Sequence, residues 1–191
     1  VGNVSATATT DGITVDTDVP TISSVVEGAT GSGNTLTDID GNIYQTVQIG
    51  DQVWMAENLK VSKYRDGTAI PNLTDNSNWT STSNGAYCIY DNNESNANTF
   101  GYLYNWYALD DIKNIAPESW HVPTDDEWKT LEMALGMSQS EADDVGWRGT
   151  NEGSKLAGNA ELWYSGDLVN NSEFGSSGFM AIPGGYRNGN I

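Results

Sequence analysis

Basic residues are scarce in this chain of 191 residues. Eight Lys and Arg stand against 26 Asp and Glu, which leaves a formal net charge of −18. Such a surface repels phosphate backbones and anionic lipid headgroups, so we expect no nucleic-acid partner. The acidic excess also favours divalent cations, but it is equally typical of a solvated acidic surface, the interpretation that we favour.

Cysteine and histidine each occur once. Because Cys88 is the only cysteine, an internal disulfide and a cysteine-based zinc site are excluded. Its neighbours in Tyr87-Cys88-Ile89-Tyr90 are mostly apolar, which predicts a buried structural thiol and not a reactive one. We expect His121 to form a hydrogen bond in its loop, an interpretation that we favour over general acid or base chemistry. The motifs of serine hydrolases, zinc peptidases and phosphate-binding loops do not occur.

Long apolar runs are missing too. No segment approaches the roughly 18 apolar residues that a membrane helix needs, so we expect no membrane-spanning segment. No basic and apolar signal segment is present, and we expect any signal to have been removed. Aromatic residues, in contrast, are plentiful, with seven Trp, nine Tyr and three Phe. Their large contact area predicts one main domain with a proper core.

The spacing of apolar residues predicts an α+β fold with short antiparallel strands, two or three helices and long loops. Residues 43–49 alternate, with Ile43, Val47 and Ile49 on one face, and Gly50-Asp51 separates them from residues 52–55. This pattern predicts a β-hairpin. Further strands are predicted over residues 86–90 and 179–182.

Three segments predict helices. Thr124 and Glu127 form a capping box at the start of the first, and Gly136 is placed to end it. The residues on its apolar face are Trp128, Leu131 and Leu135. Helical spacing predicts a second helix over residues 100–111 and a shorter one over residues 138–145.

The composition changes near residue 34. Residues 1–34 predict a strand-like N-terminal extension or linker, which ends in the flexible sequence GATGSGN, and residues 35–191 form the main domain. Long polar stretches at residues 72–85, 91–99 and 159–178 predict loops. Long ordered loops on a small core typically serve binding.

Six sequence blocks follow one another in a recognisable order. They are DIDGNIYQTVQIGDQVWMAENL (38–59), Lys63-Tyr64 with DGTAIPN (66–72), GAYCIYDN (85–92), FGYLYNWYAL (100–109), SWHVPTDDEW (119–128) and SGFMAIPGGYRNG (177–189). Together they resemble the Fibrobacter succinogenes major paralogous domain family.

The resemblance implies a C-type-lectin-like fold, related to the formylglycine-generating-enzyme branch, in secreted or surface proteins of bacteria. It implies no general catalytic activity. Two departures stand out, because the family usually has a cysteine at the position of Ala116 and continues beyond the position of Ile191. The resemblance therefore implies a domain without its usual closing disulfide and without its usual C-terminal strands.

Two oxygen-rich clusters are candidate calcium sites, because calcium takes oxygen ligands from loops. The first comprises Asp91, Asn93, Glu94 and Ser95, and the second comprises Asp38, Asp40 and Asn42. Neither completes a calcium-loop motif, and Asp and Asn are ordinary turn formers. We favour turns for both, with calcium as the alternative for residues 91–95.

Aromatic residues in the predicted loops are the candidate ligand-binding positions. They are Trp79, Trp147, Trp163 and Tyr164, although each could serve the core instead. Calcium-dependent sugar binding of the lectin type is not supported, because Ile70-Pro71-Asn72 lacks the carboxylate ligand.

Three functions remain open, and the first is a non-catalytic extracellular or cell-surface adhesion module that recognises a protein or glycan through its loops. The alternative is a structural subunit of an extracellular fibre, which self-associates through residues 1–34 by pairing with a sheet edge. The third, an oxidase of the formylglycine-generating type, requires copper or paired cysteines that this sequence does not offer.

Overall fold

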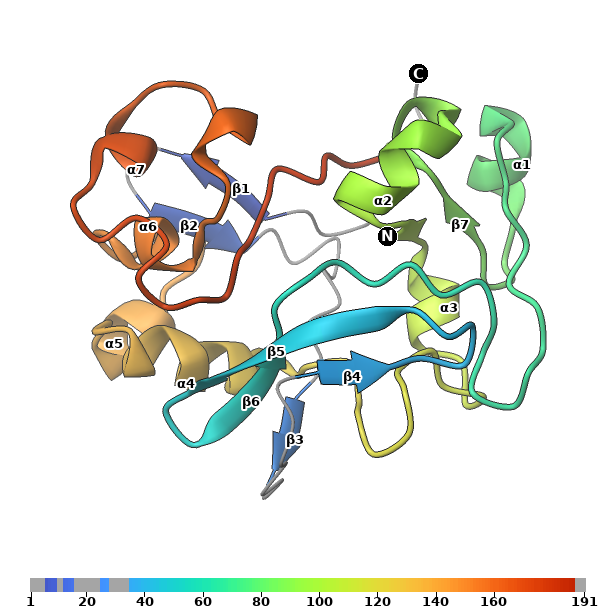
Figure 1. Cartoon of the computed structure of the whole chain (residues 1–191), viewed down its shortest axis with the longest axis horizontal. Coiled ribbons are helices and arrows are strands. Elements are labelled where there is room, and N and C mark those ends of the chain that lie inside the picture. The colour runs from blue at the N-terminus through green and yellow to red at the C-terminus, as the bar shows by residue number, and fades with distance from the viewer. Residues whose placement is uncertain (1–5, 10–11, 16–24, 28–34, 188–191) are drawn as a thin grey trace.

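The computed structural model describes residues 6–9, 12–15, 25–27 and 35–187 (Figure 1). The strands are β1 (Ala6–Thr9), β2 (Gly12–Val15), β3 (Val25–Glu27), β4 (Thr35–Thr37), β5 (Ile43–Ile49), β6 (Gln52–Met55), β7 (Tyr87–Cys88) and β8 (Leu103–Tyr104). The α-helices are α1 (Asn76–Ser81), α2 (Ala97–Phe100), α3 (Trp106–Leu109), α4 (Asp125–Ala134), α5 (Gln139–Ala142), α6 (Glu152–Leu156) and α7 (Asp167–Asn170). Short 3-10 helices are η1 (Tyr90–Asn92), η2 (Glu94–Asn96) and η3 (Ala160–Leu162).

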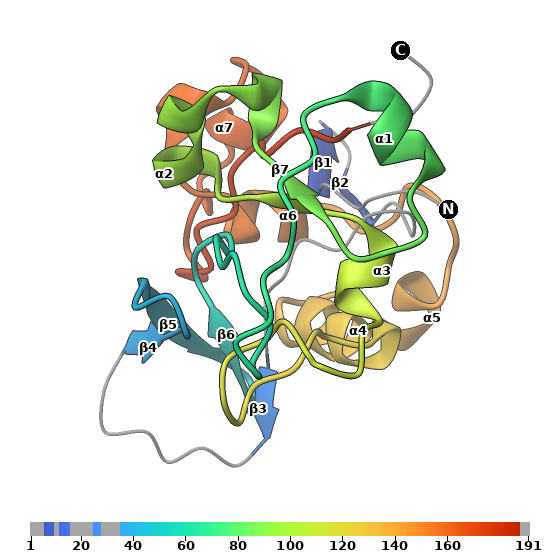
Figure 2. The same ribbon diagram turned by 90° about the vertical axis from the view of Figure 1, so that its right-hand side faces the viewer.

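The strands pair in antiparallel fashion as β1-β2, β3-β6-β5-β4 and β7-β8. Two views at right angles place the β3-β6-β5-β4 sheet on the side of the molecule away from α1 and α2 (Figures 1 and 2). The α+β class with short antiparallel strands, predicted from the sequence, is confirmed.

The predicted hairpin is confirmed as β5 and β6, joined by Gly50 and Asp51. Gly50 has a φ of 59°, which glycine adopts without strain. Successive side chains of a strand point to opposite faces, so Tyr44 and Met55 enter one core while Ile49 and Trp54 enter another. The hairpin is thus buried on both faces.

This two-sided burial corrects the predicted apolar face of β5. Ile49 is buried as expected, but Ile43 is 62% exposed and its neighbour Tyr44 is fully buried. The alternation of apolar residues placed Tyr44 on the polar face of the strand, so it could not predict that this side chain is buried. Tyr44 can be buried because its hydroxyl donates a hydrogen bond to the buried Asp38 carboxylate. An aromatic residue with a satisfied hydroxyl packs as well as an aliphatic one.

Two hydrophobic clusters make up most of the core. The first comprises Tyr44, Met55, Leu59, Val61, Tyr64, Ile70, Tyr104, Ala108 and Ile115. The second comprises Ile49, Trp54, Leu131, Leu156 and Phe179, with Trp128 packed against it. In this second cluster the ring centroids of Trp54 and Trp128 are 4.9 Å apart, and those of Trp54 and Phe179 are 5.8 Å apart.

The helix predicted after Thr124 is confirmed as α4. The Thr124 hydroxyl accepts a hydrogen bond from the Glu127 N–H (3.3 Å), and the Glu127 carboxylate accepts one from the Thr124 N–H (2.7 Å). Leu131 is fully buried, and Gly136 follows the helix end with a φ of 121°. The third predicted helix is shorter than expected and consists of α5, with a capping box of its own.

The helix predicted over residues 100–111 is confirmed only over α3 (Trp106–Leu109), and the prediction is wrong for the residues before it. Gly101 ends α2 with φ 68° and ψ −153°, a conformation that a side chain would strain. Its neighbour Tyr102 donates its N–H to the Leu59 carbonyl (3.0 Å), and the chain continues as β8 before α3 begins. Tertiary contacts with the segment around Leu59 therefore override the helical spacing.

Two predicted strands are much shorter than expected. The strand over residues 86–90 is reduced to β7, and the one over residues 179–182 to a single parallel bridge between Ala157 and Ala181. The stretches predicted as loops contain short helices, namely α1, η1, η2, α2, η3 and α7. Asp75 caps α1 and Asn93 caps η2, so the polar composition there serves helix caps as well as turns.

Strands occur in the described parts of the N-terminal segment. Ile13 and Val15 fall in β2, and β3 pairs with β6, with Val25 opposite Trp54. The segment therefore contributes a strand to the main sheet. Ile22 and the linker at residues 28–34 lie outside the described residues.

Candidate functional site

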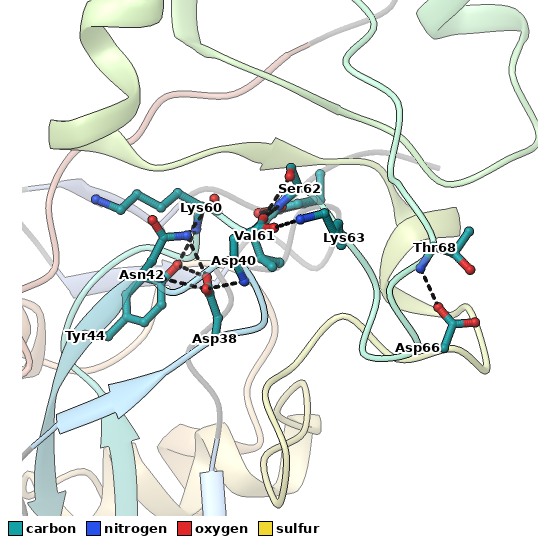
Figure 3. Close-up of polar contacts among 11 residues, drawn as sticks. Asp38, Asp40, Asn42, Tyr44, Lys60, Val61, Ser62, Lys63, Asp66 and Thr68 are labelled. Atoms are coloured by element: carbon teal, nitrogen blue, oxygen red, sulfur yellow. Dashed lines mark hydrogen bonds and ion pairs between the residues drawn. The ribbon is translucent and has the colours of Figure 1, made fainter.

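The Asp38 carboxylate is the centre of a buried turn (Figure 3). One oxygen accepts the N–H groups of Asp40 and Asn42, both at 2.9 Å. The other accepts the Asn42 side-chain amide (2.8 Å) and the Tyr44 hydroxyl (2.7 Å). Burial first, and the bond to Asp38 second, raise the pKa of Tyr44 well above its usual range. Tyr44 therefore stays protonated as a donor.

Asp40 connects this turn to the segment after β6. It accepts the N–H and hydroxyl of Ser62 and the ammonium of Lys63, the latter at 2.6 Å. Burial alone raises the pKa of Asp40, but the bonds from Lys63 and Ser62 outweigh it and lower the pKa. Because all four carboxylate oxygens of Asp38 and Asp40 accept protein donors, the turn interpretation of this cluster is supported.

The other candidate calcium cluster, residues 91–95, lies in η1 and η2. The Asn93 side-chain oxygen accepts the N–H (3.1 Å) and hydroxyl (2.8 Å) of Ser95, while Asp91 and Glu94 are exposed. Nowhere in the described ranges do three or more His, Cys, Asp or Glu side chains gather as a metal site. The geometry of Asn93 and Ser95 is that of a turn, and calcium at this loop stays a prediction.

The four candidate aromatic residues differ in exposure. Trp79 is only 8% exposed, because it lies on α1 and the Arg187 guanidinium covers its ring at 4.9 Å. Trp79 thus lies in a helix and in the core, which is the alternative given for these residues, and its role in ligand binding stays a prediction. Trp163 is half-buried and donates its indole N–H to the Gly158 carbonyl (2.8 Å), whereas Tyr164 beside it is fully exposed.

Trp147 lies on a different part of the chain, in residues 143–148 between α5 and α6, which we call the Trp147 loop. Its side chain is 58% exposed and that of Val145 is 94% exposed. Gly146 between them has a φ of 84°, which turns the chain at the tip. The loop thus presents two large apolar side chains to solvent.

The base of the Trp147 loop is tightly held. The Nε and Nη2 atoms of Arg148 donate to the Glu132 carboxylate at 3.0–3.3 Å. The third guanidinium nitrogen, Nη1, donates to the Asp144 carbonyl at 3.0 Å. On the other side of the loop, Asp143 forms an ion pair with Lys129 of α4 (3.1 Å). These bonds tie the loop to α4 from both ends.

The Glu132–Arg148 pair is buried, with side chains 1% and 7% exposed. Burial raises the pKa of Glu132, and the Arg148 guanidinium opposes the rise. Sequence reasoning missed this pair, although one signal was available. Glu132 follows Trp128 by four residues, so a carboxylate stands on the apolar stripe of α4 and must find a buried partner.

The sequence pattern of the Fibrobacter succinogenes major domain family matches residues 47–191. The chain belongs to this family. The match begins within β5, so the predicted domain boundary at residue 35 stays a prediction. Searches of curated proteins and of solved structures gave no match, and the C-type-lectin-like fold of this Fibrobacter succinogenes major domain also stays a prediction.

The single cysteine and the single histidine of this Fibrobacter succinogenes major domain both lie in surroundings that indicate a structural role. Cys88 is buried, as predicted, and burial raises the pKa of its thiol although Arg187 opposes the shift. His121 Nε2 lies 2.6 Å from Glu127 Oε1, so the histidine forms a hydrogen bond with the glutamate of the α4 capping box. His121 thus forms a hydrogen bond, but its partner lies in α4 and not in the loop as predicted.

Across the described parts of this domain, no helix combines the length and apolar character needed to span a bilayer.

Proposed function

We propose that this Fibrobacter succinogenes major domain is a non-catalytic binding module with a C-type-lectin-like fold, which acts outside bacterial cells or on their surface. It recognises a protein or glycan ligand through its loops. One observation carries the proposal, namely the large apolar side chains of the Trp147 loop, which face solvent although the loop is firmly anchored. Exposed anchors on a fixed support are typical of recognition sites.

The surroundings of the chemically versatile residues support a non-catalytic role. Cys88 is the only cysteine, and its burial raises the thiol pKa, which disfavours the reactive thiolate. His121 is held by a helix-capping glutamate. Neither residue is arranged as a nucleophile beside a free base.

A binding screen tests this proposal. The purified chain is presented to a glycan array and to a panel of surface proteins, and hits are measured by biolayer interferometry. We expect at least one hit that Trp147→Ala or Tyr164→Ala weakens, because both side chains are exposed. Ile112→Ala is the matched control, since Ile112 is also fully exposed. If no ligand binds, or if both aromatic variants bind every hit as well as the parent chain does, the proposal is wrong.

A fibre subunit is the second candidate, and the pairing of β3 with β6 favours it. A strand from the N-terminal segment completes one side of the main sheet. The same strand position could be filled by a neighbouring copy, as in β-strand exchange. Light scattering over a concentration series tests this, because concentration-dependent oligomers that disappear when residues 1–34 are deleted support it and a constant monomer mass opposes it.

A further inference from the structure

We infer that the Trp147 loop is the docking surface for a partner protein segment that carries Lys or Arg around an apolar cluster. This inference rests on the proposed function and gives it a site and a partner chemistry. Its starting point is the exposed pair Val145 and Trp147, which nothing in the described structure covers.

The loop is organised before any partner arrives. Arg148 holds one end through Glu132 and through the Asp144 carbonyl, and Asp143 holds the other through Lys129. The Gln139 side chain also donates to Asp143 (3.0 Å). Binding to such a loop costs little conformational entropy, which is the condition under which a Trp becomes a strong anchor.

The surroundings of the apolar pair select a cationic partner. Acidic residues at or beside the loop are Asp125, Glu141, Asp143 and Asp144. The nearby cations are already engaged, because Lys129 bridges Asp125 and Asp143 and Arg148 is buried against Glu132. The rim of the surface therefore keeps an excess of negative charge, and a partner with positive charge around its apolar contact complements it.

A second copy of this chain does not supply that charge. Seven of the eight basic side chains contact groups within their own chain, namely Lys63, Arg65, Lys113, Lys129, Arg148, Lys155 and Arg187. A copy would bring its acidic surface against the acidic rim instead. Nucleic acid and anionic lipid are disfavoured for the same electrostatic reason.

The chemistry of the tip favours a protein segment over a glycan. Val145 is almost fully exposed and offers no hydrogen-bonding group to sugar hydroxyls. The Arg148 guanidinium and the Asp143 carboxylate are bonded within the loop and to α4. An aliphatic and an aromatic side chain, both exposed in one short loop, fit the apolar face of an amphipathic segment.

The test uses a fluorescein-labelled amphipathic helical peptide made of leucine and lysine, with a leucine and glutamate peptide of equal length as the charge control. Fluorescence anisotropy measures binding to the full chain at low and at high salt. We expect binding of the lysine peptide only, weakened by salt. The double variant Val145→Ser/Trp147→Ser should weaken it about tenfold or more. Ile112→Ser, which removes another exposed apolar residue, should leave it unchanged.

A charge variant separates the rim from the apolar pair. Asp144→Asn changes an exposed carboxylate of the loop whose side chain holds no bond among the described residues. We expect weaker binding and a smaller salt effect, with an unchanged melting temperature. The thermal measurement also shows that each variant is folded.

Three outcomes overturn the inference. The first is no binding of the lysine peptide, and the second is binding that the double variant leaves intact, because the peptide then recognises acidic surface in general. The third is Trp147-dependent binding of a glycan probe, cellohexaose, without binding of the peptide. In each case the wider proposal survives if Trp147→Ala or Tyr164→Ala weakens a hit in the binding screen, and it fails if nothing binds or if both variants bind every hit as well as the parent chain does.

Discussion

The buried Glu132–Arg148 pair allows a strong prediction about stability. Changing Arg148→Met keeps a side chain of similar length but leaves the Glu132 carboxylate without its partner in a site where it is 1% exposed. Breaking a buried ion pair from one side typically costs about 3–5 kcal/mol. Because small domains are stable by only about 5–15 kcal/mol, the expected loss is a large share of the total.

The loss should depend on pH. Burial already raises the pKa of Glu132 above the ordinary 4.5, and removal of the guanidinium raises it further. The folded variant then binds a proton more tightly than the unfolded chain does. The contribution of Glu132 to the stability of the variant is therefore greatest below about pH 4.5, the ordinary value, and is lost as the pH rises through the raised pKa of the folded protein.

Urea unfolding, followed by tryptophan fluorescence at pH 7 and pH 5, measures both effects. We expect the deficit of Arg148→Met to be smaller at pH 5 than at pH 7. The double variant Glu132→Leu/Arg148→Met should recover most of the stability, because an apolar pair carries no desolvation penalty. Lys129→Met is the control, since its ion pairs with Asp125 and Asp143 lie at the surface and should matter much less.

Two results would refute this reasoning. A change below about 1 kcal/mol at pH 7 would mean that the carboxylate reaches water or another donor when Arg148 is removed. A double variant as unstable as the single one would mean that Arg148 acts through its bond to the Asp144 carbonyl and not through Glu132.

Three further predictions follow from individual contacts. Gly101→Ala should destabilise the fold by about 1–3 kcal/mol in urea unfolding, because φ is positive there and the new Cβ would lie 2.7 Å from the Leu59 carbonyl oxygen; an unchanged midpoint would contradict this. Glu127→Ala should cost about 1 kcal/mol at pH 7 through loss of the capping box with Thr124. Since hydrogen bonds from Thr124 and His121 outweigh burial and lower the pKa of Glu127 from 4.5, the difference from the parent chain should vanish as the pH falls through that lowered value. Calcium should leave the melting temperature unchanged, and a saturable rise that Asp91→Asn abolishes would contradict the turn interpretation of residues 91–95.

Features encoded within a few residues could be predicted from the sequence. The capping box of Thr124 and Glu127 and the turn at Gly50-Asp51 depend on neighbours in the chain. The burial of Cys88 could be predicted from its apolar neighbours in sequence, although the distant residues Trp79 and Leu103 complete its surroundings. The α+β class follows from the same local signals. The family, too, could be recognised from its ordered sequence blocks.

The candidate site could be predicted only in part. Trp147 was among the expected aromatic residues, but so was Trp79, and the sequence around each is equally polar. Only the fold distinguishes them, because Arg187 from the far end of the chain covers Trp79 while nothing among the described residues covers Trp147. The Asp38 cluster likewise became a turn and not a cation site once Ser62 and Lys63 supplied their donors.

The sequence by itself determined the short-range structure, the acidic charge and the family of this protein. Tertiary structure decided that the chain leaves the helix at Gly101 in spite of its helical spacing. It also decided which side chains of β5 are buried and which aromatic residues reach solvent. The physical reason is the same in each case. A residue's burial and its hydrogen-bond partners are set by segments far away in the chain, such as Leu59 for Tyr102 and Glu132 for Arg148. Local propensity is weak compared with these contacts.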